Sequence, residues 1–114
     1  MRRFAALCLL ASLGACASGG DRPLSAAAML PGQAFDVKAA NGQLSTLRFA
    51  QGGAVSALFG GREVAGRWAM EDDQLCFTWA GNFRECWPYA DPLRSGETRT
   101  ITSSRGNKVE VTAR

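Results

Sequence analysis

Histidine is absent from all 114 residues of this chain, and its absence removes several kinds of catalysis. The Ser-His and Cys-His arrangements that activate a hydroxyl or thiol nucleophile need an imidazole base, so neither is available. The sequence also lacks a glycine-rich nucleotide-binding motif. We therefore expect no enzyme activity and no bound cofactor.

The uncharged, mostly apolar run from Phe4 to Leu13 is too short to cross a membrane as a mature helix. It has the length of a signal-peptide h-region and follows the basic start Met1-Arg2-Arg3. Residues 1–15 are therefore predicted to be an export signal, in which Cys8 needs no role.

The end of this signal, Leu13-Gly14-Ala15-Cys16, resembles the lipobox of bacterial lipoprotein precursors. The resemblance implies cleavage before Cys16, which would carry a diacylglycerol on its thiol and a fatty acid such as palmitate on its amino group. Two or more acyl chains make membrane anchoring stable. In enterobacterial lipoproteins, an Asp directly after the lipidated cysteine resembles a signal for retention in the inner membrane. This chain has Ala17 at that position. We therefore expect an outer-membrane lipoprotein on the periplasmic face, the alternative being an ordinary secretory signal.

The mature chain has almost no net charge. Loss of Arg2 and Arg3 reduces the 13 Lys and Arg to 11, against 10 Asp and Glu. A nearly neutral domain offers no argument for nucleic acid as a partner.

Beyond the signal, residues 16–23 form the predicted lipidated Cys and a flexible tether, and residues 24–114 form the domain. Ser25 is placed to cap a short alanine-rich helix that Pro31-Gly32 ends. A helix this short is stable only if Met29 and Leu30 pack on the domain.

From Phe35 onward, short alternating segments are separated by turn signals such as Asn41-Gly42, where the glycines mark the turns. This pattern predicts an all-β fold of about eight antiparallel strands, either a small barrel or a sandwich. The expected strands are 35–39, 44–50, 55–59, 64–70, 75–79, 83–89, 98–102 and 108–113.

Cys76 and Cys86 flank a predicted three-residue loop, Ala80 to Asn82. With that loop the two cysteines oppose each other on neighbouring strands, at a β-carbon separation close to what a disulfide needs. The same register gathers the apolar side chains on one face, with Glu85 the only charged side chain among Leu75, Phe77, Trp79, Phe83 and Trp87. Since exported proteins meet an oxidising environment, we predict a structural disulfide worth about 2.5–3 kcal/mol.

Two other interpretations of these cysteines, a redox dithiol and a zinc site, have less support in the sequence. A redox dithiol usually shows a C-x-x-C spacing at the start of a helix, which is missing here. Zinc needs three or four ligands, and the mature chain has no histidine and no third thiol apart from Cys16. No metal site is predicted.

The remaining polar clusters have simple interpretations. Glu71-Asp72-Asp73 is expected to be a solvated turn, with a weak calcium contact as the minority view. A site for an anionic ligand could be formed by Arg62, Arg67, Arg84 and Trp68. These arginines fit solvent-facing strand positions equally well. The tryptophans at 68, 79 and 87 are expected to fill the core, which would leave little room for a small ligand.

The core pattern Gly66-Arg67-Trp68, Leu75-Cys76-Phe77 and Glu85-Cys86-Trp87 resembles a group of small exported proteobacterial domains. The resemblance covers about residues 24–90 and implies a fold and a disulfide, but no activity. A looser likeness connects the chain to lipocalin-like metalloprotease inhibitors and to lipoprotein inhibitors of lysozyme.

We therefore expect a non-enzymatic binding or structural module that contacts a component of the cell envelope. The alternative is an inhibitor of a cell-wall hydrolase or protease, inserting an exposed loop such as Gln51 to Gly53 or Leu93 to Gly96 into the enzyme's cleft. A carrier of a small ligand would need an open barrel.

Overall fold

A computed structural model describes residues 25–114 of the chain. The predicted export signal, the lipidation at Cys16 and the tether lie outside the described residues. The first element is α1 (Ala26–Met29), whose cap Ser25 accepts a hydrogen bond from the Ala28 amide on its Oγ. Leu30, directly after α1, is completely buried. The predicted cap is confirmed, and of the two residues predicted to pack on the domain Leu30 does so, whereas Met29 is half-buried and Ala26 packs against the core instead.

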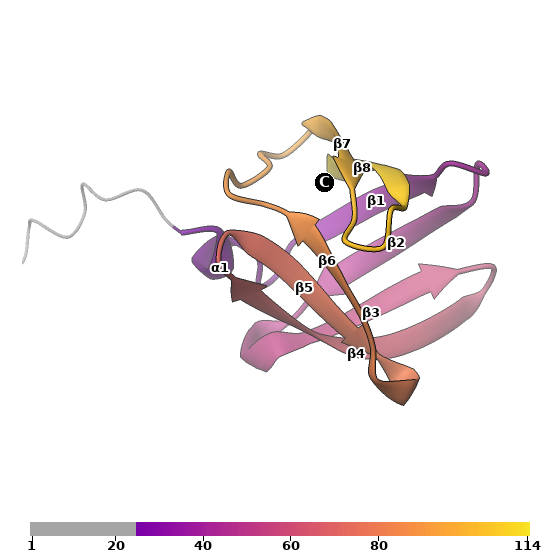
Figure 1. Ribbon diagram of the computed structural model, residues 1–114, viewed down its shortest axis with the longest axis horizontal. Coiled ribbons are helices and arrows are strands. Elements are labelled where there is room, and N and C mark those ends of the chain that lie inside the picture. The colour runs from indigo at the N-terminus through magenta and orange to yellow at the C-terminus, as the bar shows by residue number, and fades with distance from the viewer. Residues whose placement is uncertain (1–24) are drawn as a thin grey trace, which may run out of the picture.

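Eight strands form one antiparallel sheet in the order β6-β5-β4-β3-β2-β1-β8-β7, which curls into a nearly closed barrel (Figure 1). The predicted all-β class is confirmed, and the architecture is a barrel rather than a sandwich. The strands are β1 (Ala34–Ala39), β2 (Leu44–Phe49), β3 (Ala54–Phe59), β4 (Arg62–Glu71), β5 (Gln74–Trp79), β6 (Phe83–Pro88), β7 (Thr98–Thr102) and β8 (Lys108–Ala113). Two short 3-10 turns, η2 (Gln51–Gly53) and η3 (Ala80–Asn82), join β2 to β3 and β5 to β6.

The two ends of the barrel differ. Because the strands run up and down in sequence order, the tight turns after β1, β3, β5 and β7 all lie at one end, which we call the hairpin end. The helix α1 and the connections after β2, β4 and β6 lie at the other, the closed end. Figure 1 shows α1 on the opposite side of the molecule from the β1–β2 and β3–β4 turns.

Large apolar side chains fill the closed end. Phe35, at the start of β1, packs edge-on against Phe49 with ring centroids 5.0 Å apart, and it also contacts Tyr89. Leu30 and Leu93 are buried beside them. The Tyr89 hydroxyl accepts a hydrogen bond from the Leu93 amide at 2.9 Å, which fixes the long connection between β6 and β7 over this end. The barrel is therefore plugged on the side from which the chain enters it.

The disulfide joins Cys76 to Cys86, as predicted. The observed pairing of β5 with β6 runs from Gln74 opposite Pro88 to Trp79 opposite Phe83, with the two cysteines directly opposed. Both cysteines alternate with the inward side chains of their strands and are nevertheless buried, and Ser104 is hydrogen-bonded to the backbone of Cys86.

The edge strands β6 and β7 meet without a regular ladder, at what we call the seam. The β7–β8 turn, residues 103–107, bridges this seam. The Ser104 amide donates to the Cys86 carbonyl at 2.8 Å, and the Cys86 amide donates to Ser104 Oγ at 2.9 Å. Arg105 completes the bridge: its Nε donates to the Arg84 carbonyl, and its guanidinium lies 3.8 Å from the centroid of the Phe83 ring.

One glycine lies within a strand, as the predicted strand 64–70 required, and not at a turn. Gly66 lies in the middle of β4, on the inner face of the barrel. A β-carbon there would lie 2.7 Å from Cζ3 of Trp79 and 2.9 Å from the Thr78 carbonyl oxygen. The aromatic ring covers the glycine, so the missing side chain provides the space that Trp79 occupies.

Candidate binding site

The barrel interior opens at the hairpin end into a cavity of about 590 Å³. This volume is within the range of about 300–1,000 Å³ that is typical of small-molecule sites. The expectation that the tryptophans leave little room is therefore wrong. The Trp68 Nε1 donates a hydrogen bond to the Ala50 carbonyl at the closed end, and the Trp79 ring lies against Gly66. Both rings therefore lie along the wall and not across the lumen.

The cavity wall comes from inward positions of most of the strands. Its deeper part consists of buried side chains, namely Val37, Leu47, Ala57, Phe77 and Trp87. Its mouth includes half-buried apolar ones, namely Phe59, Val64, Trp79 and Val109, and polar ones, namely Asn41, Gln43, Ser45, Asn107 and Lys108. These half-buried apolar groups are the ones that a ligand would remove from water, and burial of apolar area is favourable at about 25 cal/mol per Å².

Three aromatic rings in the wall hold one another in place. Phe77 stacks on Trp79 with an interplanar angle of 12° and meets Trp87 edge-on, with centroids 4.8 Å apart. Such contacts stabilise ring positions beyond simple burial. The cavity therefore has a preorganised aromatic wall on the side of β5 and β6.

Glu85 is the carboxylate among the cavity-lining side chains. It lies opposite Phe77 in the register of β5 and β6, on the inner face of the barrel. Its Oε2 accepts hydrogen bonds from Ser103 Oγ and from Asn107 Nδ2, the latter at 2.7 Å. The charged side chain that looked out of place on an apolar face is thus held at the cavity wall by the turn that bridges the seam.

Sequence reasoning missed this arrangement. The single charged residue on the aromatic face was the available signal, but the partners of Glu85 lie 18 and 22 residues further along the chain. No local pattern connects them. Lys108, also at the mouth, follows the same turn.

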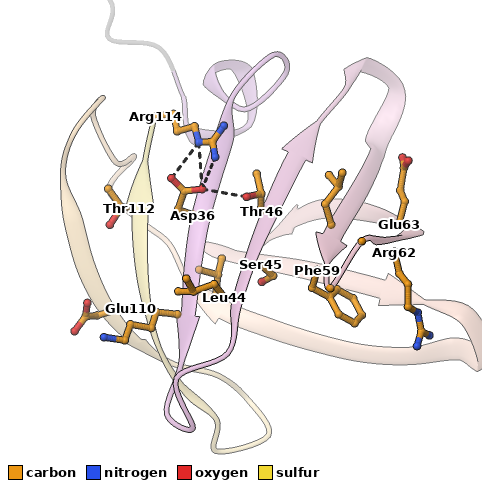
Figure 2. Close-up of a pocket in the computed structure, with 15 residues that line it drawn as sticks. Asp36, Leu44, Ser45, Thr46, Phe59, Arg62, Glu63, Glu110, Thr112 and Arg114 are labelled. Atoms are coloured by element: carbon orange, nitrogen blue, oxygen red, sulfur yellow. Dashed lines mark hydrogen bonds and ion pairs between the residues drawn. The ribbon is translucent and has the colours of Figure 1, made fainter.

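A second hollow lies on the outer surface of β8, β1, β2, β3 and β4 (Figure 2). In it, Asp36 accepts hydrogen bonds from Arg114 Nε and from Thr46 Oγ1. The Arg114 hydrogen bond is the main cause of the lowered pKa of Asp36. Positive and negative side chains are equal in number around this hollow, and its most prominent pair is already satisfied. The interior cavity is the better candidate, because its wall is largely apolar and aromatic and its carboxylate, Glu85, forms no ion pair within residues 25–114.

The other residues singled out in the sequence do not form a common site. Arg84 forms an ion pair with Glu71, whereas Arg67 donates to the Gly52 carbonyl and Arg62 lies near the Phe59 ring. Asp72 and Asp73 adopt the positive φ angles of a tight turn. Within residues 25–114, no group of three metal-ligating side chains comes together.

Two loops were predicted to be exposed for insertion into an enzyme cleft. For the loop from Leu93 to Gly96 this prediction is wrong in part. Leu93 is 1% exposed and belongs to the closed-end core, so it cannot be presented to a partner. Gln51 and Gly52 are exposed, as are the residues from Arg94 to Gly96, and Gly53 is half-buried.

None of the helices in residues 25–114 is long and apolar enough to cross a membrane. Comparison with protein-family models, curated proteins and solved structures found no match to this chain.

Proposed function

We propose that this protein is a lipid-anchored binding module of the outer membrane, facing the periplasm and acting without catalysis. The observation that carries the proposal is the barrel with one closed end and one open apolar cavity. Such a cavity with a preorganised wall is suited to hold a ligand, and the chain offers no imidazole to perform chemistry on it.

The position of the first described residues is compatible with the same proposal. The described chain begins at α1, on the closed end. An anchor at Cys16 would join the barrel through the tether on that side, so that the tether would leave the cavity mouth at the hairpin end unobstructed. A component of the cell envelope is then the expected partner.

The anchor is tested by replacing the two N-terminal cysteines separately. Cys16→Ser removes the acylated thiol and should move the protein from the outer-membrane fraction to the soluble fraction. Cys8→Ser is the matched control, because Cys8 lies in the predicted signal and its loss should leave the protein in the membrane. Unchanged fractionation of Cys16→Ser would contradict the lipid anchor.

Inhibition of a cell-wall hydrolase or protease is the alternative. It would use the exposed loops of the closed end, the end of the barrel at which the tether would join. If lysozymes and periplasmic proteases keep full activity in excess purified protein, this alternative is removed.

A further inference from the structure

We propose that the barrel cavity binds a small amphipathic organic cation, with its apolar part among the aromatic side chains and its cationic group at Glu85. This inference rests on the proposed binding function and names the ligand class. The first observation behind it is the negative charge of Glu85 at the cavity wall.

The carboxylate of Glu85 is available to a ligand. Both of its hydrogen bonds go to Oε2, and within residues 25–114 no donor contacts Oε1. The two bonds fix the carboxylate against the wall, so it needs little reorganisation when a ligand binds. In the same part of the chain it forms no ion pair with an Arg or Lys.

The neighbours of Glu85 favour a cation over other polar groups. Phe77 is directly opposite on β5, and Trp87 is two residues along β6 on the same face. Trp79 stacks on Phe77 at the mouth. Aromatic faces attract organic ammonium groups, especially where water is partly excluded, and a carboxylate adds direct charge complementarity.

The remaining wall accounts for the apolar part of the ligand. Val37, Leu47 and Ala57 form the deeper lining and offer no charged group. Lys108, next to Asn107, is exposed at the mouth, whereas Glu85 is half-buried, so the cationic group belongs at Glu85 and not at the outer rim. A molecule with one hydrocarbon portion and one ammonium group matches this division.

The test compares three probes with the same hydrocarbon chain: octyltrimethylammonium, 1-octanol and octanoate. Binding is measured by calorimetry on the full chain carrying Cys16→Ser, below the micelle concentration and without detergent. We expect the cation to bind about tenfold more tightly than octanol, a difference of about 1.4 kcal/mol, and octanoate to bind most weakly.

Variants locate the binding. Glu85→Gln keeps an oxygen that accepts from Ser103 and Asn107, and it should reduce cation affinity to that of octanol. Ala57→Phe fills the cavity and should weaken all three probes. The matched control is Ala65→Phe, on the outer face of the adjacent strand, which should leave all three unchanged.

The outcomes separate this inference from the binding proposal. If octanol or octanoate binds the unsubstituted cavity as tightly as the cation, the cation assignment is overturned while the cavity stays a binding site. If none of the three probes binds, or if Ala57→Phe has no effect on their affinity, the proposal that the cavity binds ligands fails as well.

Discussion

Two individual residues carry constraints that their neighbours do not share. The first is Gly66, which makes room for Trp79 on the cavity wall. Gly66→Ala should lower the free energy of unfolding by about 1–3 kcal/mol, because the added methyl group overlaps the indole ring. Guanidinium denaturation measures this loss.

A double-mutant cycle attributes the loss to the right contact. Combined with Trp79→Leu, which removes the ring, Gly66→Ala should cost clearly less than it does alone. A Gly66→Ala variant as stable as the parent would show that Trp79 moves without cost.

The second such residue is Tyr89, the single tyrosine of the chain. Burial raises its pKa above the ordinary value of 10.0, opposed by the hydrogen bond from Leu93. Because the folded pKa is the higher one, this contribution to stability is present below about pH 10 and is lost as the pH rises through the folded pKa.

Tyr89→Phe tests this dependence. At neutral pH it should cost about 1 kcal/mol, because the Leu93 amide loses its acceptor. Above pH 10 the stability of Tyr89→Phe should fall less steeply than that of the parent. Tyrosinate absorbance reports Tyr89 alone, and a phenol that titrates at or below pH 10 in the folded protein would contradict the assignment.

The β7–β8 turn bonds to three consecutive residues outside its own hairpin, Arg84, Glu85 and Cys86. Ser103 Oγ donates to Glu85 and accepts from the amides of Arg105 and Asn107, both at 3.2 Å. One hydroxyl thus shapes the turn and joins it to β6.

Ser103→Ala should destabilise the fold by about 1–3 kcal/mol, because it leaves several polar groups with fewer partners. It should also speed hydrogen exchange at the Cys86 and Ser104 amides, which bridge the seam. Ser95→Ala, at an exposed position in the connection between β6 and β7, is the control and should change neither quantity. Equal exchange in both variants would mean that the seam does not depend on Ser103.

Element by element, the sequence was most informative where two local constraints agreed. The pairing of Cys76 with Cys86 followed from loop length and from the aromatic face, and both depend on residues close together in the chain. The cap at Ser25 and the turn at Asn41-Gly42 are equally local. These features were predictable because their physical causes span only a few residues.

At the scale of the whole molecule, prediction from sequence was weaker. The cavity depends on how the sheet closes: β1 pairs with β8, whose residues are far apart in the chain, and this pairing brings β7 to the seam with β6. Alternation placed Phe77, Trp79 and Trp87 on one face but could not indicate the empty volume in front of them. The position of Glu85 depended in the same way on a turn from a different hairpin.

Closure also has a consequence for solubility. The two edges of the sheet, β6 and β7, face each other, so each hinders the other from adding a strand of a neighbouring molecule. Release of the 103–107 turn would expose both edges in a single event. The few hydrogen bonds of that turn therefore also protect the protein against aggregation.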